Sequence, residues 1–330
     1  MNNRISNYNK LLKINIDDYI TIENNQIVAK DGVQVKKIGK GRYGTVYLIK
    51  TDNIKFALKQ TNQPNNKETE LMDVITKKSI EYKIPFFMMY IKTIIIGEYK
   101  YHIVELLDGT LDELIRDKDI SLKEWNSILL QFYFGLHLLH KKLKILHLDA
   151  SLYNIMLYNT DVKELKYDYC GTKIVIPLFG YIIIIGDYGH ADYMDSNNEN
   201  TMKKKKMNFD YFYLKYALSN VERTFFMNKF NVEQIVNFMK RNNIKIPKFN
   251  SKHSDKPNSR AYHKDITNYR KELFWVLFDS KNIEKMYKQH NTFNHIKKIP
   301  QPVINKVSKM HILLYKRKDD FCAVYKILLK

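Results

Sequence analysis

The stretch 147-HLDASLYN-154 places polar side chains in a run that is otherwise mostly apolar. Asp149 is a carboxylate that can accept a proton from an attacking hydroxyl group. Asn154 and Asp187, the latter directly after the run IIIIG, supply the amide and carboxylate oxygens that Mg²⁺ prefers alongside phosphate oxygens. These residue types therefore indicate chemistry on a phosphate-bearing ligand bound with a divalent cation.

A second group of residues, 39-GKGRYGTV-46, has its glycines and valine at the spacing G-x-G-x-x-G-x-V. It lies between two predicted strands, whereas a dinucleotide-binding turn should open a helix. Glycines in such a hairpin let the backbone lie close to phosphates without obstruction by side chains. The alternative is an ordinary β-hairpin with no ligand.

Lys59 closes the apolar stretch 56-FALK-59 and can point beneath the glycine hairpin, where it would bind phosphates as a point charge. The alternative is a lysine whose side chain extends to solvent. A lysine that binds phosphates needs a carboxylate to hold it in place. We expect Glu70 to do this because it precedes an apolar helical run, and Glu68 is the alternative.

The elements that must position these residues change in kind along the chain. Strand-like patterns dominate the first part, at 33–39, 45–50, 54–60 and in two strands joined at Gly97-Glu98, with one helix over 67–82. Helical patterns dominate later, at 110–118, 121–143, 208–230 and 270–289, with strands within 173–189. This order predicts an α+β protein with a candidate cleft between a sheet and a helical region. Residues 1–31 read as a polar lead-in with one short helix around 8–20.

Composition narrows the class of protein further. Lys and Arg number 55 against 35 Asp and Glu, and a net charge of +20 attracts acidic proteins, phosphates, nucleic acid or anionic membrane surfaces. No nucleic-acid-reading motif accompanies the lysines, and the codon usage of an AT-rich genome explains the bias equally well. The two cysteines have no metal-binding spacing and favour a reducing compartment. We see no signal peptide or membrane span, and we expect a soluble, cytoplasmic protein.

The order of these motifs resembles that of the eukaryotic protein-kinase family. A glycine loop, a strand lysine, a helix glutamate, H-x-D-x-x-x-x-N and D-Y-G follow one another, and the likeness covers roughly residues 33–220. It implies a bilobal fold with an extension over 1–32, a small β-rich N-lobe over 33–107 and a larger, mostly helical C-lobe over 108–330. It also implies an ATP-dependent kinase that uses Mg²⁺, or Mn²⁺, to phosphorylate serine or threonine in protein substrates.

The resemblance assigns a role to individual residues. Asp149, Lys59 and Glu70 would be catalytic, and Asn154 and Asp187 would hold the metal. Val104 would be the gatekeeper of the adenine pocket, and Asp210 would brace the backbone of the catalytic loop. The residues that would bind ATP are Ile38, Gly39, Lys40, Gly41, Arg42, Tyr43, Gly44, Thr45, Val46, Ala57, Lys59, Glu105 and Leu107. His147 is expected to be a core residue, and His190 a packed or solvated one.

The chain departs from the family's H-R-D-x-K-x-x-N pattern at two places, where Leu148 replaces the arginine and Ser151 the lysine. Without the arginine, with a short segment from Asp187 to Asp210 and with no A-P-E motif, we expect no switching by activation-loop phosphorylation. The missing lysine keeps two alternatives open, a pseudokinase that serves as a binding scaffold and a small-molecule kinase of related fold.

The connection from Asn154 to Asp187 is long for the family and contains an inserted hairpin. This insertion resembles kinases encoded by large DNA viruses, and the D-Y-G motif resembles the haspin-like branch. The likeness suggests a viral serine/threonine kinase, located in the host cytoplasm and alternatively in the virion. Nothing in the sequence specifies an oligomeric state.

Overall fold

The fold comes from a computed structural model of the 330-residue chain. The structure describes residues 2–23, 26–40, 44–62, 66–194 and 232–249, together with residues 210, 266, 269, 273, 300, 302, 303, 305–307, 321 and 325. The predicted helices over 208–230 and 270–289 therefore lie almost entirely outside the described residues, as does the KKKK run at 203–206.

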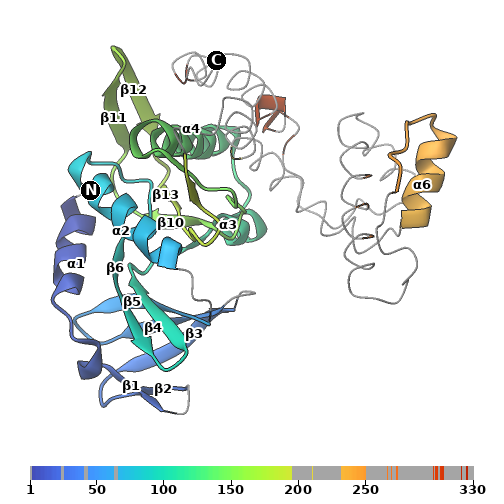
Figure 1. The fold of residues 1–330 in the computed structure, drawn as a ribbon. Helices are drawn as coiled ribbons and strands as arrows, with labels where there is room; N and C mark the ends of the chain where they lie inside the picture. The colour runs from blue at the N-terminus through green and yellow to red at the C-terminus, as the bar shows by residue number, and fades with distance from the viewer. Residues whose placement is uncertain are drawn as a thin grey trace. The chain divides into compact units, whose positions relative to one another are not determined.

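A five-stranded antiparallel sheet carries the first part of the chain (Figure 1). In spatial order its strands are β3 (Gln34–Lys40), β4 (Gly44–Lys50), β5 (Lys55–Thr61), β7 (Tyr99–Val104) and β6 (Tyr90–Ile96). All five strands were predicted from their apolar patterns. Helix α2 (Asn66–Glu81), also predicted, packs against the sheet at β6.

Residues 2–23 and 26–32 are part of the folded sheet region and not only the polar lead-in that was expected. Helix α1 (Asn2–Leu12) runs beside β6 (Figure 1), earlier in the chain than the helix predicted around 8–20. A 3₁₀ turn (Ile16–Asp18) and the hairpin of β1 (Ile20–Glu23) and β2 (Gln26–Ala29) follow. Their apolar side chains share one buried cluster with the sheet, formed by Leu11, Ile14, Ile16, Ile20, Ile49, Phe56, Leu58, Ile91, Tyr101 and Ile103. In the sequence these few apolar residues are scattered among many Asn residues, so their pattern did not predict a buried segment.

A helical region with short strands follows β7. Capping boxes begin α3 (Leu111–Asp117) at Thr110 and α4 (Leu122–Leu138) at Ser121, and a π-helical turn (Leu139–Leu143) extends α4. Helix α4 is buried along almost its whole length, as its apolar sequence predicted. It packs against the strands β12 and β13.

The strands of this region form small sheets that surround the motif residues. One sheet has the order β13 (Tyr181–Ile185), β10 (Ile155–Asn159), β8 (Gly109–Thr110). Strands β11 (Glu164–Tyr169) and β12 (Thr172–Pro177) form the inserted hairpin, and β14 (Asp192–Tyr193) pairs with β9 (Ile145–Leu146). The short strands β8, β9, β10 and β14 were not predicted, because a few residues carry no resolvable period.

The chain divides into two compact units, residues 1–217 with 299–330 and residues 218–298. The first unit contains both the five-stranded sheet and the helical region, so the lobe boundary predicted between 107 and 108 lies within it. The second unit contains helix α6 (Val232–Arg241). Among the described residues no helix is both long enough and apolar enough to cross a membrane.

Candidate active site

The pairing of two strands brings Asn154 next to Asp187. Strands β10 and β13 are antiparallel with Ile155 opposite Ile185, so the start of β10 lies beside the end of β13. Asn154 directly precedes β10 and Asp187 follows β13 by two residues. The backbone N–H of Gly186 donates to the carbonyl of Asn154 at 3.0 Å and joins the two turns. The structure therefore brings together the two residues that the sequence predicted as metal ligands.

Asp149 and Asn154 are also in direct contact. The side-chain amide of Asn154 donates to the backbone carbonyl of Asp149 at 2.8 Å and to its carboxylate Oδ2 at 3.1 Å. The amide group that donates is the NH₂, so the Oδ1 atom of Asn154 is directed elsewhere and is a suitable ligand for a cation. Asp149 itself is half-buried.

Asp210 holds the loop that carries Asp149. Its fully buried carboxylate accepts hydrogen bonds from the backbone N–H groups of His147 at 2.7 Å and Leu148 at 2.5 Å, and it contacts His140 Nε2 at 2.8 Å. Leu148 has a φ of +63°, a left-handed conformation that costs a non-glycine residue about 1–3 kcal/mol. Two charge-assisted hydrogen bonds offset that cost. The bracing role that the resemblance implied for Asp210 matches this geometry.

His147 links the same loop to the D-Y-G turn. Its Nε2 lies 2.9 Å from the carbonyl of Gly186, which can only accept, so Nε2 carries the proton. Its Nδ1 then accepts from the N–H of Asp149 at 3.3 Å. The ring is fully buried and packs edge-on against Tyr188, whose hydroxyl donates to the carbonyl of Ile185. His147 is thus a core residue, as the sequence predicted.

Lys59 connects the sheet to the D-Y-G turn. Its ammonium group lies 2.7 Å from Oδ1 of Asp187 and 2.8 Å from Oε1 of Glu68. Burial disfavours the charged ammonium, but Asp187 and Glu68 outweigh that effect and raise the pKa of Lys59. Burial acts on Asp187 as well, yet the charge of Lys59 lowers the pKa of that carboxyl group. At neutral pH Lys59 is therefore a cation and Asp187 a carboxylate.

The partner of Lys59 on α2 is Glu68, and the preference for Glu70 was wrong. Glu68 is buried, whereas Glu70 is exposed and accepts a hydrogen bond from the hydroxyl of Tyr193 at 2.8 Å. The helical period explains the difference, because Glu68 shares one face with Leu71, Met72 and Ile75, at i+3, i+4 and i+7. Glu70 is two residues further on and points away from that face. This spacing was present in the sequence and could have decided between the two.

Helix α2 is also tied to the strand that follows the D-Y-G turn. Lys67 forms an ion pair with Asp192, and Glu70 accepts from Tyr193, so both residues of β14 reach α2. Burial and the charge of Glu70 raise the pKa of Tyr193 to about 12, so its hydroxyl stays a donor. Both contacts join the N-terminal part of α2, which carries Glu68, to β14.

The described part of the glycine loop comprises its two strands. Gly41, Arg42 and Tyr43 lie outside the described residues, whereas Ile38, Gly39 and Lys40 on β3 lead into the loop and Gly44, Thr45 and Val46 on β4 leave it. A Cβ atom at Gly44 would lie 2.0 Å from the carbonyl oxygen of Gln60, so only glycine lets β4 approach β5 here. The expected hairpin is therefore present.

The segment 105–107 has no regular structure and connects β7 to β8. The N–H of Glu105 donates to the carbonyl of Met89, and no backbone hydrogen bond among the described residues engages the N–H of Leu107. Val104, the expected gatekeeper, is the last residue of β7 and directly precedes this segment. It pairs with Ala57 of β5. Ile38, on the edge strand β3, is 47% exposed.

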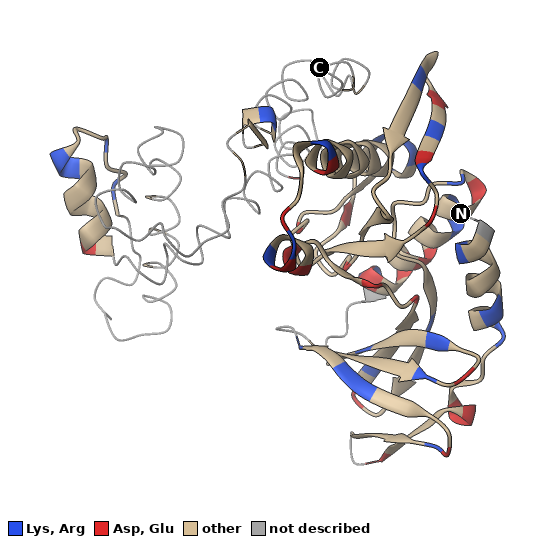
Figure 2. Ribbon diagram, turned by 180° about the vertical axis from the view of Figure 1, so that it is seen from behind, with Lys and Arg blue, Asp and Glu red and all other residues tan. Residues whose placement is uncertain are grey.

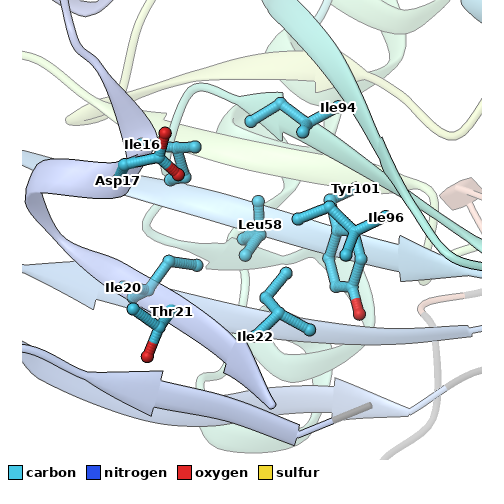
Figure 3. Close-up of a pocket in the computed structure, with 9 residues that line it drawn as sticks. All are labelled: Ile16, Asp17, Ile20, Thr21, Ile22, Leu58, Ile94, Ile96 and Tyr101. Atoms are coloured by element: carbon cyan, nitrogen blue, oxygen red, sulfur yellow. The ribbon is translucent and has the colours of Figure 1, made fainter. Parts of the chain in front are cut away.

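A small apolar pocket of about 30 Å³ lies elsewhere on the sheet (Figure 3). It is lined by Leu58, Tyr101 and residues of the N-terminal hairpin, and it has room for about one water molecule. Successive side chains of a strand point to opposite faces, so Leu58 and Lys59 face opposite sides of β5. This pocket is thus separate from the cluster around Lys59.

A β-rich first region, a helical second region and this set of charged residues define the class of protein kinases. Residues 33–214, more than half of the chain, match the family described as protein kinase domain, and the chain therefore belongs to the protein kinase family. The predicted α+β kinase fold is thereby confirmed. A Dictyostelium discoideum protein named "Probable serine/threonine-protein kinase fhkB" is 29% identical over 190 residues, which cover 54% of this chain and 15% of that protein. The chain thus spans a small part of that relative's length.

Proposed function

We propose that this protein is a serine/threonine kinase that transfers the γ-phosphoryl group of ATP to protein substrates. The observation that carries the proposal is the convergence of Lys59, the Asp149–Asn154 loop and Asp187, three segments far apart in the sequence that hydrogen bonds bring together. The preference for serine and threonine rests on the relative's printed name and on the family resemblance.

The nucleotide would lie between the glycine hairpin and the 105–107 segment. Ile38, Val46 and Ala57 offer apolar surface to adenine, and the exposure of Ile38 suits a side chain that a ligand covers. The carbonyl of Glu105 and the N–H of Leu107 would hydrogen-bond its edge. Lys59, held by Glu68, would bind phosphate oxygens.

The residues that would hold Mg²⁺ fit a hard cation. Oδ1 of Asp187 contacts Lys59, and the side chain of Asp187 is 46% exposed. Asn154 presents an amide oxygen from the neighbouring turn. Mg²⁺ is usually bound by one or two such protein oxygens together with substrate phosphates and waters. When bound, it would neutralise charge that develops on the phosphate oxygens.

Asp149 would act on the acceptor. Its carboxylate, fixed by the Asn154 amide, would orient the substrate hydroxyl for in-line attack and receive its proton as the O–P bond forms and ADP leaves. Most of the rate enhancement would then come from positioning and from charge stabilisation. Lys59 supplies part of this, since its raised pKa keeps it charged.

The second candidate is a pseudokinase scaffold, favoured by one observation. Ser151 occupies the position where the family has a lysine that steadies the γ-phosphate, so the catalytic loop lacks that cation. Against this candidate, the chain retains Lys59, Asp149 and Asp187, and Glu68 lies beside Lys59. The small-molecule kinase remains the alternative for substrate class.

We also propose that the site is assembled without phosphorylation of the activation segment. Leu148 cannot bind a phosphate, whereas the contacts Lys67–Asp192 and Glu70–Tyr193 already join α2 to β14. These contacts would do what an added phosphate does in other kinases, which is to hold the glutamate helix against the site.

The net charge of the protein indicates only the broad class of its partners. Figure 2 shows Lys and Arg distributed over many of the described elements with Asp and Glu among them, so the net charge of +20 is not gathered on one described element. Acidic protein substrates fit this charge. A viral origin, and a location in the host cytoplasm or virion, stay predictions from the sequence.

The proposal is tested by offering radiolabelled ATP and Mg²⁺ to the purified protein with a panel of protein and metabolite acceptors. Label on serine or threonine of a protein is the expected result. Label on metabolites alone would favour the small-molecule kinase. Stabilisation of the protein by ATP with no transfer to any acceptor would favour the scaffold.

A further inference from the structure

Arg4, on the first turns of α1, is completely buried behind the segment 105–107. Its Nε donates to Oε2 of Glu105 at 3.0 Å, and its Nη2 donates to the carbonyl of Phe87 at 2.8 Å. The guanidinium group also contacts the carbonyl of Pro85 and Oε1 of Glu105. It lies 5.3 Å from the ring centre of Tyr158 on β10.

This arrangement satisfies a charge that would otherwise be costly to bury. An arginine presents its donors in a planar fork that matches a carboxylate, and removing either partner of a buried pair leaves the other uncompensated. The side chains of Arg4 and Glu105 are only 1% and 11% exposed. The pair is therefore shielded from solvent and from screening by salt.

Glu105 extends the network to a third segment. Its Oε1 accepts a hydrogen bond from the N–H of Met89 at 2.7 Å, and its own N–H donates to the carbonyl of Met89 at 3.0 Å. The Arg4–Glu105 pair thus joins α1, the stretch 85–89 and the connection after β7. Tyr158 adds a contact beyond that connection, on the side of the helical region.

We infer that Arg4 is a positioning residue for nucleotide binding, and this inference rests on the proposed function. Arg4 lies outside residues 33–214, which match the kinase family, yet it fixes the residue whose backbone would contact adenine. By holding Glu105, α1 sets the position of the backbone groups at 105–107. The N-terminal helix is then a part of the nucleotide site.

Loss of this anchor has a characteristic kinetic signature. Adenine is remote from the transferred phosphoryl group, so its contacts with the protein are equally strong in the ground state and the transition state. Weakening such contacts raises the KM for ATP and leaves kcat unchanged. A loss of overall stability alone would lower the amount of active protein and would not change the KM of the folded fraction.

The test compares Arg4→Lys and Arg4→Ala with Lys10→Ala, which removes an exposed cation from the same helix. Arg4→Lys keeps the charge but loses the fork. In protein shown by circular dichroism to be folded, we expect the affinity for ATP in calorimetry to fall roughly 3- to 30-fold in both Arg4 variants. The kcat should stay within about twofold, and Lys10→Ala should match the wild type.

Three results would overturn the inference. Folded Arg4 variants with wild-type affinity for ATP would refute it while leaving the proposed function intact, and a wild-type protein that binds no ATP would refute both. If Arg4→Ala does not fold, Arg4→Lys and hydrogen exchange decide. We expect faster exchange at the amides of Met89 and Glu105 in Arg4→Lys than in Lys10→Ala, and equal rates would contradict the role of Arg4.

Discussion

Replacing Glu68 by Gln should weaken phosphotransfer far more than the same change at Glu70. The two residues are on one helix and two positions apart, so helix propensity and side-chain size are matched. Glu68 is buried and lies 2.8 Å from the ammonium group of Lys59, whereas Glu70 is exposed and contacts only a tyrosine hydroxyl among the described residues.

The magnitude follows from the environment of each residue. A hydrogen bond to a charged partner contributes about 1.5–3 kcal/mol, which corresponds to roughly 10- to 150-fold in kcat/KM if Lys59 is misplaced. Asp187 and Glu68 both raise the pKa of Lys59 against the opposing effect of burial, so with Asp187 still in place Lys59 should stay protonated in the variant. Interactions at exposed sites contribute about 0–1 kcal/mol, so Glu70→Gln should cost less than about fivefold.

Steady-state transfer from radiolabelled ATP, with circular dichroism as a check of folding, measures both variants. Because Glu68 lies on the buried face of α2 beside Lys59, we expect Glu68→Gln to be slower than Glu70→Gln. A larger loss in Glu70→Gln, or a loss under about threefold in folded Glu68→Gln, would show that α2 is rotated differently in the working protein.

Two further outcomes are expected. Burial and the charge of Lys59 lower the pKa of His102 from 6.5 to about 4, so between these pH values the unfolded chain binds a proton that the folded one does not. The free energy of unfolding should therefore fall by about 3 kcal/mol as the pH drops from 6.5 to 4. In urea unfolding, the stability of His102→Leu should lack the part of the decline that comes from His102. A pH profile equal to that of the wild type would contradict this role of His102. Phosphatase treatment should leave kinase activity within about twofold of its starting value, because Lys67–Asp192 and Tyr193–Glu70 hold α2 without a phosphate; abolished activity would show that a phosphate is needed.

The sequence predicted those parts of the site that depend on local patterns. The strand that carries Lys59 and the turns that carry Asp149, Asn154 and Asp187 each follow from a short apolar run next to a polar residue. Their convergence followed only from the order of the motifs, because the antiparallel pairing of β10 with β13 is a long-range contact.

The contact of the N-terminal helix with Glu105 was beyond prediction for the same reason. Arg4 and Glu105 are 101 residues apart, and an arginine in an Asn-rich stretch has the pattern of a solvated residue. The choice between Glu68 and Glu70 was different, since the helical period already placed Glu68 with Leu71, Met72 and Ile75. There the information was local and only the interpretation was wrong.

The most direct test of the central claim is the rate of γ-phosphoryl transfer by Asp149→Ala beside the wild type, with ATP affinity measured on the same samples. Asp149 contacts Asn154 and not Lys59, so the variant should bind ATP nearly as the wild type does. Its transfer rate should fall by roughly 100-fold or more, the usual contribution of a general base. Turnover preserved in Asp149→Ala would contradict the assignment, and so would a wild-type protein that binds ATP and transfers nothing.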